Sequence, residues 1–132
     1  MQKKSIKLNI IDEEKMVSNF DTSGDADNKF IGEVLKVYVN DIPMMSKELE
    51  IAYGSRDSVK LRYIAHKLSG SLLNLGCEDL AELCQKIEIS IKKNNFNEDI
   101  SLVIGELKES TTILVTDLNK LKEKYPVSDK TN

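Results

Sequence analysis

The sequence contains no tryptophan and has little proline, little glycine and few aromatic residues. Two prolines and six glycines in 132 residues are too few for an all-β protein, which needs a turn about every 8–12 residues. An aromatic content of 5% leaves the core to Leu, Ile and Val, which suits helix packing. The length fits a single domain with one core. The composition therefore favours an all-α domain.

Long apolar runs and an excess of positive charge are also missing. No segment approaches the roughly 20 apolar residues of a membrane span, and residues 1–11 lack the apolar stretch of a signal peptide. The formal net charge of −3 provides no electrostatic reason to bind nucleic acid or an anionic membrane surface. We therefore expect a cytoplasmic protein that binds neither nucleic acid nor membranes.

Residues that form metal sites, disulfides or hydrolytic sites are scarce. One histidine and two cysteines make no metal-ligand cluster. Cys77 and Cys84 lie about two turns, roughly 10 Å, apart along one predicted helix, which is too far for a disulfide. We expect Cys84 to pack in the core and Cys77 to be partly exposed. Without a nucleophile–base pair or facing carboxylates, a hydrolase is not expected.

The apolar periodicity predicts four long helices preceded by a short one. The short helix covers residues 12–20, and the first long helix runs from Asp27 or Asn28 to Gly54. Pro43 either kinks this helix, which we favour, or starts a new one. The remaining helices begin at Asp57 or Ser58, at Glu78 and at Asn97, and they end near Gly76, Lys92 and Tyr125.

Short connections between long amphipathic helices predict antiparallel neighbours. The expected fold is an antiparallel up-down four-helix bundle with an additional short N-terminal helix. We assign residues 1–26 to an N-terminal segment whose short helix packs on the bundle, residues 27–125 to the bundle, and residues 126–132 to a disordered tail.

The predicted third helix has an unusual second face. A helical wheel at about 100° per residue gathers its core stripe into Leu61, Ile64, Leu68, Leu72 and Leu75. His66 falls about 160° from the middle of that stripe. The residues on the same side of the helix are Val59, Tyr63, Gly70 and Leu73. A solvated face would instead carry Lys, Glu or Gln.

A glycine inside a helix costs about 1 kcal/mol relative to alanine, and it is tolerable where another molecule approaches the backbone. We interpret His66 and Gly70 as a reactive imidazole with free space beside it, in a surface that docks another protein. The ordinary alternatives are a surface histidine without a role and a glycine that permits close helix packing.

Several motifs on the third and fourth helices together resemble one known family. The residues Ala65-His-Lys-Leu-Ser-Gly-Ser71, then Asn74-Leu-Gly76, and then Leu80, Leu83-Cys84 and Ile87-Glu88 resemble the histidine-containing phosphotransfer (HPt) domains of bacterial-type two-component phosphorelays. The likeness in helix lengths and apolar spacing extends from about Phe30 to Leu121.

The resemblance implies that His66 is a phosphorelay intermediate. It would accept a phosphoryl group from an aspartate on the receiver domain of a hybrid histidine kinase and pass it to the receiver aspartate of a response regulator. Gly70 would leave room for the receiver's active site. The sequence has no glycine-rich phosphate loop and no nucleotide site, so we expect neither kinase nor hydrolase activity of its own. We also expect a monomer, and no cofactor, because Mg²⁺ is expected on the partner receiver.

One position departs from the family pattern, which usually has a lysine three residues after the histidine. This chain has Ser69 there. Three residues are candidates to support the phosphoryl group: Ser69 through its hydroxyl, and Arg62 and Lys67 through their charge, about 60°, 40° and 100° from His66 on the wheel. Either cation can equally be a solvated surface charge.

Glu88 on the fourth helix is the last candidate. Family members place Gln or Glu at this position, where it accepts from the imidazole Nδ1–H and leaves Nε2 as the nucleophile. The alternative is a carboxylate in water at the edge of the helix.

Two other functions also fit the sequence. One is a helical interaction module that docks receiver-like partners but cannot be phosphorylated. The other is an unrelated four-helix bundle in which His66 is a coincidence.

Overall fold

The computed structural model describes residues 7–21 and 28–127, and these residues form helices joined by short connections. The helices are α1 (Glu13–Phe20), α2 (Asn28–Gly54), α3 (Ser58–Asn74), α4 (Glu78–Lys92) and α5 (Glu98–Lys124). The described part of the chain contains no strand. The prediction of an all-α fold is confirmed.

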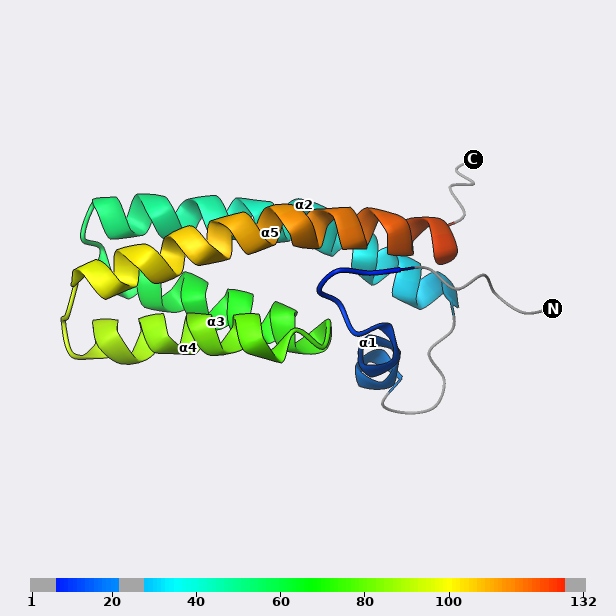
Figure 1. The fold of residues 1–132 in the computed structure, drawn as a ribbon, viewed down its shortest axis with the longest axis horizontal. Helices are drawn as coiled ribbons and strands as arrows, with labels where there is room; N and C mark the ends of the chain where they lie inside the picture. Colours follow the sequence, from blue (N-terminus) through cyan, green and yellow to red (C-terminus); the bar gives the residue numbers. More distant parts are fainter. Residues whose placement is uncertain (1–6, 22–27, 128–132) are drawn as a thin grey trace.

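The four long helices run antiparallel to their sequence neighbours and form a bundle of two layers. Figure 1 shows α2 and α5 side by side in one layer and α3 and α4 in the other, with α1 beside one end of the bundle. The closest packing joins α3 to α4 and α2 to α5, and α2 also packs on α3. The predicted up-down bundle with a short extra helix is therefore confirmed.

Local capping explains where the helices start. Asp12, Asp57 and Asn97 each accept a hydrogen bond from the backbone N–H three residues later, at 3.0–3.1 Å, which satisfies one of the free donors at a helix N-terminus. α2 continues through Pro43 as one helix, as favoured above. A cap at Asp27 lies outside the described residues.

Gly76 ends α3 in the left-handed conformation that the sequence predicts. Its φ of +75° suits glycine, which lacks the side chain that opposes this conformation. The turn is closed by a hydrogen bond from the Cys77 N–H to the Leu72 carbonyl at 2.9 Å. The turn allows α4 to start at Glu78 and to return along α3.

The core is aliphatic, as the composition indicates. All five residues of the predicted α3 stripe are buried, and Cys84 is buried with them. The expectation that Cys77 is partly exposed was wrong, since its side chain is 4% exposed. The segment before α1 covers this turn, because a Cβ on Gly76 would lie only 3.2 Å from the Asp12 carbonyl oxygen.

A buried carboxylate ties the N-terminal segment to α5. Asp117 is fully buried and accepts hydrogen bonds from the backbone N–H groups of Asn9, Ile10 and Ile11 at 2.6–3.1 Å. These backbone donors stabilise the buried charge. Met16 on α1 is fully buried as well, so α1 packs on the bundle.

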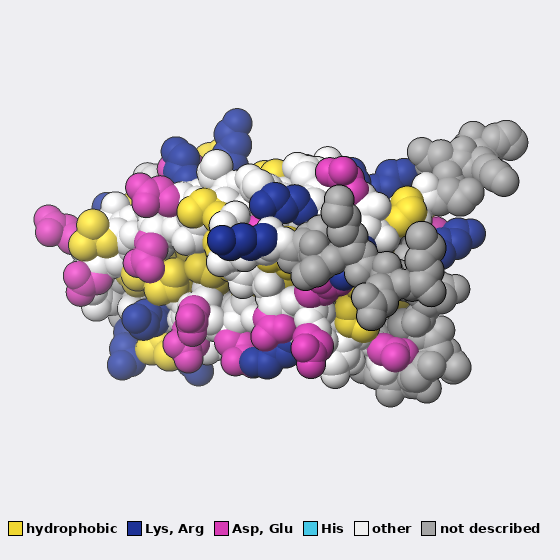
Figure 2. All heavy atoms as spheres, turned by 45° about the vertical axis from the view of Figure 1, so that its right-hand side comes forward, with side chains coloured by type: hydrophobic (Ala, Val, Ile, Leu, Met, Phe, Trp, Pro, Cys, Tyr) yellow, Lys and Arg dark blue, Asp and Glu magenta, His cyan; other side chains and the backbone are white. Residues whose placement is uncertain are grey.

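The surface carries charges of both signs. Figure 2 shows acidic and basic side chains mixed over one face, with smaller apolar patches between them. None of the described helices is both long and apolar enough to span a membrane.

Candidate functional site

His66 lies on α3 and is held from α4. Its side chain is 81% exposed, and its Nδ1 lies 3.0 Å from Oε1 of Glu88, which is 24% exposed. Since an ionised carboxylate only accepts, Nδ1 is the donor of this hydrogen bond. The neutral imidazole then has its lone pair on Nε2. The structure thus places together the two residues that the sequence analysis paired.

The face around His66 is apolar and open. Val59, Tyr63 and Leu73 are exposed at 80%, 64% and 42%, respectively. A Cβ on Gly70 would meet no atom within 4 Å, so the space beside the imidazole is free. Gly70 is therefore not a helix-packing glycine, and the alternative raised for it above is excluded.

A shallow hollow adjoins the imidazole. It encloses about 410 Å³ and is lined by Val59, Arg62, Tyr63, His66 and Glu88. The hollow thus contains a nucleophile, the carboxylate that orients it and a guanidinium group, with apolar side chains at its edge.

Lys67 and Ser69, the other residues predicted to support the phosphoryl group, lie in different environments. The Lys67 ammonium lies 5.8 Å from the centre of the Tyr63 ring, a cation–π distance on the exposed face around His66. Ser69 is only 5% exposed. The structure therefore corrects the expected position of Ser69, which packs into the bundle beside the buried Ala65 instead of sharing the exposed face of His66.

Three residues of α4 that border the site were not predicted from the sequence. A second hollow of about 340 Å³ continues from Arg62 and Glu88 and is lined also by Gln85, Ile89 and Lys92. Ile89 is 58% exposed. Helical spacing on α4 signals all three. Gln85 and Lys92 stand three before and four after Glu88, and Ile89 stands four after Gln85 and three before Lys92, so they lie along one flank of the helix.

No group of three or more His, Cys, Asp or Glu side chains that could hold a metal occurs within residues 7–21 and 28–127. An imidazole nucleophile with a fixed tautomer fits covalent transfer of a group to and from a partner.

The chain is similar to a known protein family and to a solved structure. The family model of the Hpt domain matches residues 33–121. The crystal structure of histidine-containing phosphotransfer protein B (HptB) from Pseudomonas aeruginosa PAO1 superposes with a TM-score of 0.73 at 21% identity, covering 87% of this chain and 96% of that chain. At this identity the superposition shows the fold. A search of curated protein sequences found no match.

Hpt domains are phosphoryl carriers of two-component phosphorelays that interact with receiver domains. The family model covers well over half of the chain and includes His66, Gly70 and Glu88. The chain belongs to the Hpt domain family and has its histidine phosphotransfer role.

Proposed function

We propose that His66 accepts a phosphoryl group from an aspartyl phosphate on one receiver domain and passes it to the aspartate of a second receiver. The observation that carries this proposal is the exposed imidazole whose Nδ1 lies 3.0 Å from Glu88. The donor would be the receiver of a hybrid histidine kinase, and the acceptor that of a response regulator.

The phosphoryl transfer needs no reactant other than the imidazole and the aspartyl phosphate. The lone pair of Nε2 attacks phosphorus and forms an N–P bond. The P–O bond to the receiver aspartate breaks, and its electron pair stays on the aspartate as a carboxylate. The phosphorylated ring keeps the Nδ1 proton and becomes positively charged, which the neighbouring Glu88 carboxylate stabilises. Onward transfer is the same step in reverse with the second aspartate.

The exposed apolar residues Val59, Tyr63 and Leu73 would dock the receiver, with its active site over Gly70. Burying exposed apolar area contributes about 25 cal/mol per Å², and exposed apolar patches mark protein interaction sites. On α4, Ile89 extends this apolar surface beyond Glu88. The proposed docking face thus includes residues of both α3 and α4.

Arg62 would offset the added phosphoryl charge, because it lines the same hollow as His66. Lys67 is the second cation on this face, next to Tyr63. Mg²⁺ would be bound by the receiver and would supply electrostatic stabilisation of the transferred group. This chain would act as a monomeric carrier without kinase or hydrolase activity of its own.

The deciding experiment mixes the protein with receivers phosphorylated with labelled phosphate. We expect acid-labile, base-stable label on the wild type and none on His66→Gln. Label that persists on His66→Gln contradicts the proposal. Receiver binding without any label on the wild type would instead indicate an interaction module that cannot be phosphorylated.

A further inference from the structure

A groove between α2 and α5 lies apart from the phosphotransfer site. It encloses about 500 Å³, within the range of roughly 300–1,000 Å³ typical of small-molecule sites. His66 and Glu88 belong to α3 and α4, which form the other layer of the bundle (Figure 1). The groove exists because small side chains face each other here, Pro43 and Ser46 on α2 and Thr111 on α5.

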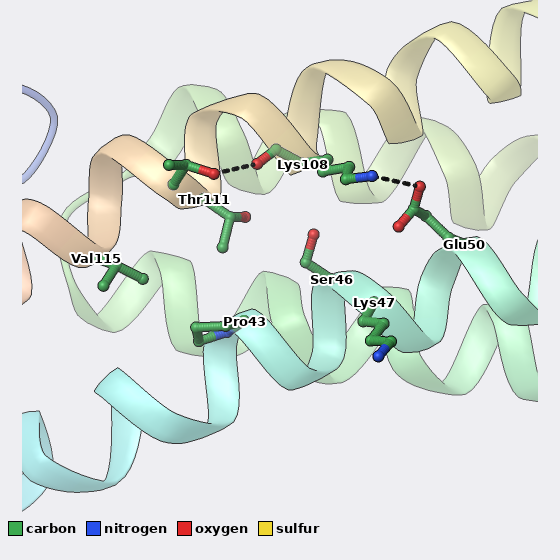
Figure 3. A pocket seen from close by; sticks show the side chains of 8 residues that line it. Pro43, Ser46, Lys47, Glu50, Lys108, Thr111 and Val115 are labelled. Carbon is green, nitrogen blue, oxygen red and sulfur yellow. Dashed lines mark hydrogen bonds and ion pairs between the residues drawn. The ribbon is translucent and has the colours of Figure 1, made fainter.

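A hydroxyl without a partner points into this groove. Ser46 is 5% exposed, and its oxygen forms no hydrogen bond with any residue that the structure describes. Figure 3 shows this oxygen directed towards α5. Thr111, on the facing helix, differs because its hydroxyl donates to the Leu107 carbonyl at 2.6 Å. No buried side-chain oxygen of the described residues lacks a partner, so the Ser46 oxygen is reached from the groove and is free to bond a ligand there.

The mouth of the groove carries a weak ion pair. The Lys108 ammonium lies 3.3 Å from Oε2 of Glu50 across the groove (Figure 3). Both side chains are more than a third exposed, and exposed pairs of this kind contribute little to stability. Lys47 also lines the groove, but Figure 3 shows its ammonium turned away from the ion pair. Lys108 is therefore the cation that an anionic ligand group can reach, by replacing Glu50.

The remainder of the groove is apolar. Figure 3 shows the Pro43 ring and the Val115 methyl groups on opposite sides of the same hollow, away from the ion pair. A ligand that fits both ends has an acidic group and an apolar body.

We propose that the groove between α2 and α5 binds small monocarboxylic acids with an apolar body. The carboxylate accepts hydrogen bonds from the Lys108 ammonium and the Ser46 hydroxyl, and the hydrocarbon part lies between Pro43 and Val115. This site is separate from the phosphoryl chemistry of His66 and does not depend on it.

The test is an NMR titration of the ¹⁵N-labelled protein with octanoate. We expect the amide shifts to concentrate in residues 44–50 and 108–115, with no change at His66. Lys108→Gln and Ser46→Ala should each weaken binding about tenfold, since each removes a hydrogen bond to a charged group. Glu50→Gln should tighten binding, because it removes the anion that competes for Lys108. Glu109→Gln, an exposed change on α5 outside the groove lining, is the matched control and should leave the affinity unchanged.

Three results overturn the proposal. One is the absence of groove shifts at millimolar octanoate. The second is equal binding of octanol and octanoate to the wild type and to Lys108→Gln, because it shows an apolar patch without anion recognition. The third is occupation of the groove by a second copy of the chain, seen as shifts that depend on protein concentration without octanoate. Lys108→Gln changes an exposed side chain. A spectrum of this variant that matches the wild-type spectrum away from the groove verifies that the variant is folded.

Discussion

The Nδ1 atom of His66 lies 3.0 Å from Oε1 of Glu88, so the only histidine of the chain is oriented by a neighbouring helix. Glu88→Ala removes the acceptor and frees the imidazole to change tautomer and rotate. We expect phosphorylation of His66 to slow at least about tenfold, as with other orienting partners of histidine. The measurement is the initial rate of label transfer from a phosphorylated receiver.

Glu88→Gln is the matched control, because its amide oxygen still accepts from Nδ1–H but carries no charge. It should be slower than wild type and faster than Glu88→Ala. Equal rates for all three proteins would remove Glu88 from the mechanism.

Gly70 and Gly32 should respond oppositely to the same substitution. Gly70→Ala meets no atom within 4 Å and improves helix propensity, so the free energy of unfolding should rise by about 1 kcal/mol. Phosphotransfer should nevertheless slow, because the new methyl group occupies the space that the receiver would enter. Urea unfolding and transfer kinetics, measured on one preparation, separate the effect on stability from the effect on phosphotransfer. An unchanged transfer rate in Gly70→Ala would argue against docking of the receiver over Gly70.

At Gly32, a Cβ would collide with the backbone carbonyl oxygen of Tyr125. Either α2 or the end of α5 must shift to accommodate it. Gly32→Ala should therefore lower the free energy of unfolding by about 1–3 kcal/mol. A stability equal to wild type in urea would show that this contact relaxes freely.

Arg62→Ala tests the electrostatic support of the phosphoryl group. Arg62 lines the hollow that contains His66, so its loss should change both the lifetime of phosphohistidine and the rate of onward transfer, by a few-fold for an exposed charge. Lys60→Ala removes an exposed cation of the same helix outside that hollow and is the control. If both variants keep wild-type lifetimes and rates, Arg62 is only a surface charge.

Asp117→Asn should loosen the N-terminal segment. The carboxylate accepts from three successive backbone N–H groups, and an asparagine offers one acceptor oxygen and turns an N–H₂ group towards those donors. We expect a loss of about 2–4 kcal/mol in the free energy of unfolding, with faster hydrogen exchange at residues 9–11. Glu123→Gln, an exposed change on α5, should have neither effect.

The two cysteines should be unreactive in the folded protein. Burial raises the pKa of Cys77 and of Cys84 from 9.0 to about 12, and the charges of Asp117 and Glu88, respectively, add to the effect. A raised pKa means that the folded state holds the thiol proton more tightly than the unfolded state. This contribution to stability is complete below about pH 9 and is lost as the pH rises from 9 towards 12.

Alkylation by iodoacetamide at pH 8 checks this expectation. Both thiols should react slowly in buffer and rapidly in urea, because the thiolate is the reactive form. Rapid labelling of Cys77 in buffer would contradict its burial beneath the N-terminal segment.

Much of the fold could be predicted from local patterns. Helix starts at Asp12, Asp57 and Asn97 and the left-handed turn at Gly76 depend on hydrogen bonds within a few residues, so the sequence contains the whole signal. The exposure of His66 follows equally from one helix, because the wheel needs only the positions of its own apolar residues.

Cys77 and Ser69 show where such reasoning fails. A wheel orders residues around one helix, but the width of the buried stripe depends on which neighbours cover its edges. The flank that contains Ala65 and Ser69 is buried, and the chain before α1 closes over the turn at Cys77.

The helices, their apolar faces and the outward direction of the single histidine follow from the sequence alone, because each depends on spacing along the chain. Three features exist only in the folded bundle: Nδ1 of His66 meets Glu88 at 3.0 Å, Asp117 binds the backbone of a segment over 100 residues away, and a groove remains between α2 and α5. Each of these is a distance between groups on different elements. The packing of the whole bundle sets such distances, and no local pattern contains them.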